Sequence, residues 1–200
     1  MAGQEMEIGE RLLALKEELR EIRLAMIPWR FKNADLALID EGVAKYIKSF
    51  PFKRGCKGLF LIGGVGTGKT YSVATFAKFV IDRGNDALIK NVASFLTELK
   101  EKMVNNKDKK SYYEHLSDIT HSAVLILDDI GVEKASDWVK EILYFIVNER
   151  YENGAITCFT SNYPLSELAE RIGPRIVSRI RETCEVIELG GEDRRLTANN

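Results

Sequence analysis

Short apolar runs alternate along the chain with longer stretches in which apolar residues recur every three or four positions. Runs of four to six residues without polar alternation are typical of strands buried on both faces. The stretches after residues 70, 94 and 136 have the spacing of amphipathic helices. The sequence therefore predicts four buried strands separated by helices. The four runs occupy residues 59–62, 87–92, 124–127 and 155–160.

The first stretch, residues 8–26, has apolar side chains alternately four and three positions apart, with charged residues between them. This spacing predicts an amphipathic helix, which Pro28 ends. Two interpretations of its apolar stripe remain open: packing on the same domain, or docking onto a partner, for example as a coiled coil. We therefore treat residues 1–26 as a separate N-terminal region. The stripe consists of Ile8, Leu12, Leu15, Leu19, Ile22 and Met26.

A glycine-rich segment follows the first apolar run directly and fits the pattern G-x-x-x-x-G-K-[ST]. Glycines let backbone N–H groups curl around phosphate oxygens, the lysine neutralises the outer phosphates, and the last hydroxyl can bind Mg²⁺. A helix that starts near Thr70 would point its positive end at the same anion. The sequence thus predicts a site for ATP or ADP with Mg²⁺. Its candidate residues are Gly63, Gly64, Val65, Gly66, Thr67, Gly68, Lys69, Thr70 and Tyr71.

Two adjacent carboxylates, Asp128 and Asp129, end the third apolar run. Such a pair at the tip of a buried strand is costly without a counter-charge, so a cation is expected there. We expect Asp128 to hold Mg²⁺ through its water shell and Asp129 to polarise the water that attacks the terminal phosphate. Asn162, just beyond the fourth run, is a candidate for contacting the γ-phosphate or this water, although asparagine at a strand end is often a turn former.

Residues 27–31 combine apolar and cationic side chains roughly thirty positions ahead of the phosphate loop. A nucleotide base needs an apolar slot, and a segment that enters just before the nucleotide core can line it. Ile27, Arg30 and Phe31 are therefore candidate base contacts. Alternatively, Trp29 and Phe31 are ordinary core residues, which is the interpretation that the sequence alone favours.

The charge balance gives no overall attraction to nucleic acid, because 200 residues carry a formal net charge of −1. One stretch, residues 100–110, is a local exception, and Tyr112 and Tyr113 follow it closely. We expect a solvated loop here or, alternatively, a contact to single-stranded nucleic acid. The lysines of this stretch are Lys100, Lys102, Lys107, Lys109 and Lys110.

Three widely spaced cysteines, Cys56, Cys158 and Cys184, argue against a zinc site or a disulfide framework and fit a reducing cytosol. His115 and His121 have no ligand-like spacing, so we expect them to be surface or structural residues. No run approaches transmembrane length and no signal peptide opens the chain. These features predict a cytoplasmic protein without a membrane partner.

Four motifs in order, GGVGTGKT, VLILDDIG, ILYFIVNERYENGAITCFTSNYPLSEL and GPRIVSRI, make residues 27–196 resemble one family of AAA+ ATPases. This family contains the DnaC and DnaI helicase loaders and the transposition ATPase IstB. The resemblance implies an α/β fold for residues 27–200: a three-layer P-loop NTPase with a five-stranded parallel sheet, helices on both faces and no helical lid. It also implies ATP hydrolysis at subunit boundaries and self-association into a ring or spiral.

The resemblance assigns roles to individual residues. Lys69 and Thr70 become the phosphate-loop pair, Asp128 and Asp129 the Walker B acids, and Asn162 the first sensor. Arg179 falls at the arginine finger, Arg175 is a second arginine near the interface, and Arg195 lies where the family's terminal arginine falls. In the predicted helix around them, Ile176, Val177 and Ile180 can face the core, so we expect Arg179 to point outward.

The function implied is an ATP-hydrolysing loader that assembles on single-stranded DNA and places a replicative DNA helicase there. An alternative within the same class is an IstB-like transposition helper, which would prefer duplex DNA. Two further alternatives are a P-loop small-molecule kinase, for which no acceptor pocket is legible, and a non-catalytic scaffold gated by ATP. The adjacent carboxylates Asp128 and Asp129 count against the scaffold, because a protein locked by ATP could dispense with the second acid.

Overall fold

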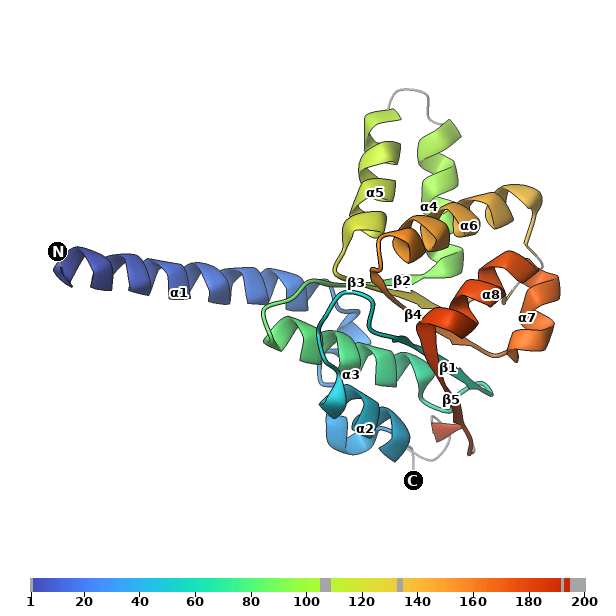
Figure 1. The fold of residues 1–200 in the computed structure, drawn as a ribbon, viewed down its shortest axis with the longest axis horizontal. Coiled ribbons are helices and arrows are strands. Elements are labelled where there is room, and N and C mark those ends of the chain that lie inside the picture. The colour runs from blue at the N-terminus through green and yellow to red at the C-terminus, as the bar shows by residue number, and fades with distance from the viewer. Residues whose placement is uncertain (1, 105–108, 133–134, 192, 195–200) are drawn as a thin grey trace.

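Five parallel strands form the centre of the molecule, in the order β2-β3-β4-β1-β5. The computed structural model describes residues 2–104, 109–132, 135–191 and 193–194 (Figure 1). Because every pair of neighbouring strands is parallel, the carboxyl ends of the strands meet at one edge of the sheet. The strands are β1 (Gly58–Gly63), β2 (Ala87–Asn91), β3 (Val124–Asp128), β4 (Ile156–Ser161) and β5 (Cys184–Leu189).

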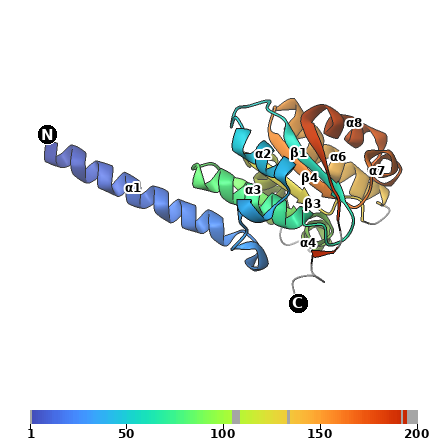
Figure 2. The same cartoon turned by 90° about the horizontal axis from the view of Figure 1, so that it is seen from below.

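Helices cover both faces of the sheet, which gives three layers (Figure 1 and Figure 2). On one face, α2 and α3 share a core with Leu59 and Leu61 of β1. On the other face, helices α4 to α8 share a core with Phe60. Successive residues of β1 thus enter opposite cores, as expected for a strand buried on both sides. The helices are α1 (Ala2–Ala25), α2 (Glu41–Ser49), α3 (Lys69–Asp82), α4 (Val92–Val104), α5 (Lys109–His121), α6 (Asp137–Glu152), α7 (Leu165–Ile172) and α8 (Pro174–Thr183), with two short 3₁₀ helices at Trp29–Phe31 and Leu36–Leu38.

The four strands predicted from apolar runs are confirmed, and so is the five-stranded α/β fold with helices on both faces. The fifth strand, β5, corresponds to no apolar run. It pairs with β1 at the edge of the described sheet, and Glu185, Val186 and Glu188 of β5 are exposed. An edge strand with charged side chains has no continuous apolar pattern, so periodicity alone could not identify it.

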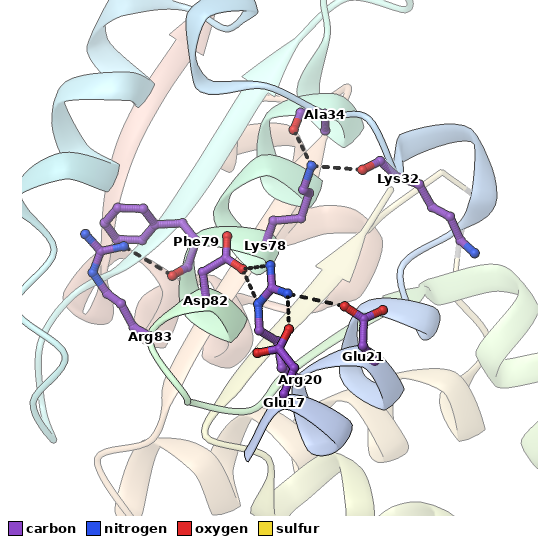
Figure 3. A network of polar contacts seen from close by, with 9 residues as sticks. All are labelled: Glu17, Arg20, Glu21, Lys32, Ala34, Lys78, Phe79, Asp82 and Arg83. Atoms are coloured by element: carbon purple, nitrogen blue, oxygen red, sulfur yellow. Dashed lines mark hydrogen bonds and ion pairs between the residues drawn. The ribbon is translucent and has the colours of Figure 1, made fainter. Parts of the chain in front are cut away.

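Helix α1 projects from the three-layer body as a long rod (Figure 1 and Figure 2). Its base is fixed to the C-terminal end of α3. Arg20 forms an ion pair with Asp82 at 2.7 Å, and the Nη1 atom of Arg23 donates to the carbonyl of Gly84 at 2.9 Å. Figure 3 shows Arg20 with its three acidic partners and, nearby, the Lys78 ammonium between two carbonyls of the segment that follows α1. The apolar stripe takes no part in these contacts, since its side chains are 42–65% exposed.

The prediction of a solvated loop at residues 100–110 is wrong for those residues of the stretch that the structure describes. Helix α4 continues to Val104 and α5 begins at Lys109, so Lys100 and Lys102 lie in helical turns. Lys102 pairs with Glu98 one turn earlier, at 3.6 Å, and the ring of His115 lies 3.0 Å from the same carboxylate. Lys107 lies outside the described residues. The apolar positions of α5 were too widely separated by polar residues for the sequence to predict this helix.

In the segment after α1, residues 27–31, the favoured interpretation was that Trp29 and Phe31 are ordinary core residues, and the structure differs from it. Trp29 is 83% exposed and is therefore not a core residue. Ile27 is buried with the α3 side of the core, at 4% exposure. Phe31 is half-buried, with its ring edge-on to Tyr71 at 6.5 Å between centroids. The apolar residues of this short segment thus divide between core, surface and the edge of a cavity.

Candidate nucleotide-binding site

The phosphate loop connects the end of β1 to the start of α3, which begins at Lys69. Gly66 and Gly68 have φ values of +79° and +95°, a conformation that residues with a side chain rarely adopt. The hydroxyl of Thr67 donates to the carbonyl of Gly64 at 3.0 Å and closes the loop. The N-terminus of α3 therefore opens onto a ring of backbone groups that is suited to an anion.

Lys69 lies inside this loop and is 5% exposed. Its ammonium donates to the carbonyls of Gly63 and Gly64, at 2.8 Å and 2.7 Å. The cation is thus held at the place where the outer phosphates of a nucleotide would lie. Nucleotide binding would exchange carbonyl partners for phosphate oxygens, which form stronger, charge-assisted hydrogen bonds.

Asp128, at the end of β3, is buried and lies beside the phosphate loop although 58 positions separate it from Thr70. The Thr70 hydroxyl lies 3.1 Å and 3.2 Å from the two carboxylate oxygens. The hydroxyl of Thr160 donates to the same carboxylate at 2.6 Å. Burial raises the pKa of Asp128 above its usual range and the charge of Asp129 acts in the same direction, whereas the hydrogen bonds from Thr160 and Thr70 oppose the rise.

Asp129 has a φ of +59°, unusual for a residue with a side chain. Its backbone N–H donates to the hydroxyl of Thr160 at 2.8 Å. One hydroxyl therefore accepts from Asp129 and donates to Asp128, and it fixes the turn between the two acids. The carboxylate of Asp129 accepts from the Nδ2 atom of Asn91 at 3.5 Å, a long contact that restrains it weakly.

The oxygen donors of Thr70 and Asp128 fit Mg²⁺, which proteins typically bind through one or two carboxylates together with phosphate oxygens. Within the described ranges, no group of three or more His, Cys, Asp or Glu side chains could hold a metal ion. A cation at this place would therefore depend on the phosphates of a bound nucleotide for the rest of its ligands.

A cavity of about 860 Å³ extends from the phosphate loop toward the segment after α1. This cavity brings together most of the residues predicted from sequence, including Arg30, Phe31, Tyr71 and Asn162. The prediction that Ile27 lines it is not supported, because Ile27 is in the core. The full lining is Arg30, Phe31, Leu38, Val65, Gly66, Gly68, Lys69, Thr70, Tyr71, Asp129, Asn162 and Arg194.

Sequence reasoning missed Leu38 and Arg194 at this cavity. The backbone N–H of Arg194 donates to the carbonyl of Gly66 at 3.1 Å, and its Nη1 atom donates to the carbonyl of Leu38 at 3.1 Å. The resemblance directed attention to Arg195, which lies outside the described residues. Thr160, the last residue of the fourth apolar run, was not among the candidate site residues. Contacts between segments so far apart in the chain leave no local signal.

Arg179 and Arg175 lie on α8, and neither lines this cavity. The prediction that Arg179 points outward is wrong. Its guanidinium lies over the ring of Tyr144 on α6, 4.9 Å from the centroid, and donates to the Tyr144 hydroxyl at 3.3 Å and to Asn148. Arg175 is exposed. The apolar residues of α8 do face the core as expected, and the half-buried Arg179 uses α6 as its partner.

Three comparisons relate this chain to known proteins. It is 30% identical to the replicative helicase loader DnaI of Bacillus subtilis over 76% of this chain and 52% of that protein. It is 24% identical to the putative ATP-binding protein of insertion sequence IS21 of Pseudomonas aeruginosa, over 98% of this chain and 75% of that protein. The crystal structure of the DnaC helicase loader superposes with a TM-score of 0.72 and 28% identity, over 82% of this chain and all of that one.

The chain spans about half the length of the curated helicase loaders that it matches. No helix among the residues that the structure describes has the length and apolar character needed to cross a bilayer. The model of the IstB-like ATP binding protein family matches residues 15–200, nearly the whole sequence. With its phosphate loop, the Asp128 and Asp129 pair and the five-stranded sheet in the expected arrangement, this chain belongs to the family of IstB-like ATP-binding proteins.

Proposed function

We propose that this protein hydrolyses ATP and uses the reaction to place a replicative DNA helicase on single-stranded DNA. The observation that carries the hydrolysis is the Thr70, Asp128 and Asp129 arrangement at the open end of the sheet, with the Thr160 hydroxyl between the acids. The similarity to DnaI and DnaC supports the loader role. A protein that only bound ATP would not need the second carboxylate facing the same cavity.

The proposed reaction transfers the γ-phosphoryl group to water, and the protein supplies position and charge rather than a covalent intermediate. Lys69 neutralises the outer phosphates. Thr70 and Asp128 hold Mg²⁺, which offsets phosphate charge when it is bound. Asp129 orients the attacking water and accepts its proton, while Asn162 lies at the same cavity and contacts the γ-phosphate or that water.

The nucleotide base occupies the other end of the cavity in this proposal. Phe31 and Tyr71 offer the apolar surface there, and Arg30 lies at its rim. The Tyr71 hydroxyl accepts from the backbone N–H of Asp35 at 2.9 Å, which fixes the ring. ATP and ADP would share these contacts, so the discrimination between them falls to the residues around the terminal phosphate.

The first prediction tests the chemistry. Asp129→Asn should bind ATP almost normally but hydrolyse it about 10²-fold more slowly, because the amide cannot accept the proton of the attacking water. Binding is measured with a fluorescent ATP analogue and turnover by phosphate release. Asp118→Asn, which neutralises an exposed acid on α5, is the matched control and should retain full turnover. Equal turnover of Asp129→Asn and the parent would remove Asp129 from this role.

The second prediction tests the DNA and partner assignments. In the presence of ATP, the protein should bind single-stranded DNA in preference to duplex DNA and increase the amount of helicase retained on a circular single strand. The lysines of residues 100–110, including Lys107, are the proposed DNA contacts. Binding should therefore weaken steeply with salt, and replacing Lys102, Lys107, Lys109 and Lys110 together by Gln should lower affinity about tenfold.

A transposition helper is the second candidate, because the IS21 protein aligns with almost all of this chain. Preference for duplex DNA, together with capture of a transposase instead of a helicase, would favour it over the loader. Both candidates require self-association into a ring or spiral, in which Arg179 or Arg175 of one subunit completes the site of the next. A small-molecule kinase would instead work as a monomer.

A further inference from the structure

The apolar stripe of α1 is the most extensive exposed apolar feature of the described chain. Its members from Ile8 near the tip to Ile22 are 42–65% exposed, and Met26, directly after the end of α1, is 55% exposed. Single exposed apolar residues are common, but five on one helical face, followed by Met26, indicate a surface that another element covers. The base of α1 is fixed to the body by Arg20, Arg23 and Leu24.

The geometry of α1 keeps this stripe away from its own body. Spacing of four and three places the six residues at the a and d positions of a heptad repeat. We call the line of a and d residues the seam. In the same repeat Glu17 and Leu24 are f positions, directly opposite the seam, and Arg20 is a neighbouring b position. The face that contacts α3 is therefore the back of the seam. Packing α1 on its own domain has left the residues of the stripe from Ile8 to Ile22 exposed.

The charges beside the seam discriminate between orientations of a second helix. Arg11 and Glu18 are g positions, and Gly9, Lys16 and Arg23 are e positions. A parallel pair would place Arg11 against Lys16 of the second helix, which is repulsive, and Glu18 against Arg23. Arg23 is already bonded to a carbonyl of its own body. An antiparallel pair brings g against g and e against e, so Arg11 faces Glu18 twice and Lys16 faces Gly9 twice.

We propose that two copies of this chain associate through an antiparallel pair of α1 helices. Ile8 packs against Leu19 of the second copy and Leu12 against its Leu15, and the two-fold axis repeats both layers. Charge complementarity along the seam identifies the second copy as the occupant, because one helix supplies both the Arg11 and the Glu18 that the pairing needs. The dimer is weak, with a Kd in the range of about 1–10 μM, because four apolar layers form a short interface.

The two bodies fit this arrangement. In the proposed register the backbone of Ala2 lies level with Ala25 of the second copy, so each tip stops at the base of the other helix. The helices are 24 residues long, which separates the bodies by about 36 Å. A shift by one heptad would gain apolar layers but would drive each tip past the partner's base. That shift would also oppose Glu18 to Glu18 and Lys16 to Lys16 of the second copy.

The third prediction uses a matched pair of leucines. In sedimentation equilibrium without nucleotide, Leu15→Glu should weaken dimerisation at least tenfold, because it places a charge in the centre of the seam. Leu13→Glu makes the same substitution at a more exposed leucine of the same helix, at 68% exposure, but outside the seam. It should leave the association unchanged. Circular dichroism and ATP-analogue binding check that both variants are folded.

Charge exchange then tests orientation and register. Arg11→Glu and Glu18→Arg should each weaken the dimer about five- to tenfold, and the double variant should restore it, since the Arg11 and Glu18 pairs reform with opposite signs. In a parallel dimer Arg11→Glu would strengthen the association by facing Lys16. That result would overturn the antiparallel arrangement, and a parent protein that is monomeric at all concentrations would assign the stripe to another protein. Neither result depends on nucleotide, so failure here is distinct from failure of the proposed ATPase.

Discussion

Arg179→Ala should bind ATP nearly as well as the parent protein but hydrolyse it about 10³-fold more slowly. Arg179 does not line the cavity of its own chain, and in the proposed assembly it acts on the γ-phosphate of a neighbouring subunit. Its guanidinium would leave the Tyr144 ring for that phosphate when subunits assemble. Turnover per subunit should accordingly rise with protein concentration in the parent, as followed by phosphate release across a dilution series.

A mixing experiment distinguishes this role from a packing role. Arg179→Ala and Lys69→Ala proteins, each nearly inactive alone, should partly restore turnover together, because some interfaces then combine an intact Lys69 with an intact Arg179. Asn148→Ala is the matched control, since it removes an intrachain partner of Arg179 and keeps the cation. It should retain turnover within a few fold. No recovery on mixing, with turnover independent of concentration, would favour the kinase alternative.

Arg150→Met should reduce the free energy of unfolding by about 4 kcal/mol. Arg150 is fully buried at 0% exposure, and its guanidinium binds the C-terminal end of α5 and the start of β4. Among the residues that the structure describes, no carboxylate forms an ion pair with it. Methionine fills much of the volume but leaves these acceptors unsatisfied in the interior. They are the carbonyls of Ile119, Thr120, Ser122 and Ile156 and the hydroxyls of Ser122 and Thr157, at 2.6–3.3 Å.

Burial lowers the pKa of Arg150 to about 10, which still leaves it charged at neutral pH. At pH 7 its desolvation is offset by these hydrogen bonds and by the charge of Asp86. Urea unfolding followed by circular dichroism measures the loss, and the melting temperature should fall by about 10 °C. Arg181→Met, at an exposed arginine of α8, should change stability by less than about 0.5 kcal/mol. A comparably small loss in Arg150→Met would show that water replaces the guanidinium at these acceptors.

The sequence predicted the centre of the fold because its strands are buried on both faces. Uninterrupted apolar runs at β1 and β3 reflect that burial directly, and the phosphate loop has a fixed spacing that the backbone geometry requires. Helix α5 was not predicted because lysines and tyrosines occupy its first turns. The edge strand β5 was not predicted because much of it is exposed to solvent, so its sequence has no continuous apolar run.

The positions of individual side chains were predicted less well than the helices and strands. Arg179 lies on a helix whose apolar residues face the core as expected, yet a long cationic side chain can turn back onto aromatic rings of a neighbouring helix. Trp29 is exposed although its size favours burial. Arg150 was not predicted to be buried, although it is among the most completely enclosed side chains of the described residues. Such positions depend on contacts between distant segments, which periodicity does not encode.

The hydroxyl of Thr160 has a consequence for how variation in this family should be interpreted. It bonds to the carboxylate of Asp128 and to the backbone of Asp129, although it belongs to a different strand. The geometry of both acids therefore depends on a third position, and a substitution at residue 160 would disturb both without changing either. A relative that has both aspartates but no hydroxyl at this position would match the sequence motif and lack the hydrogen bonds that position the two acids. Positions 128, 129 and 160 therefore form one structural unit.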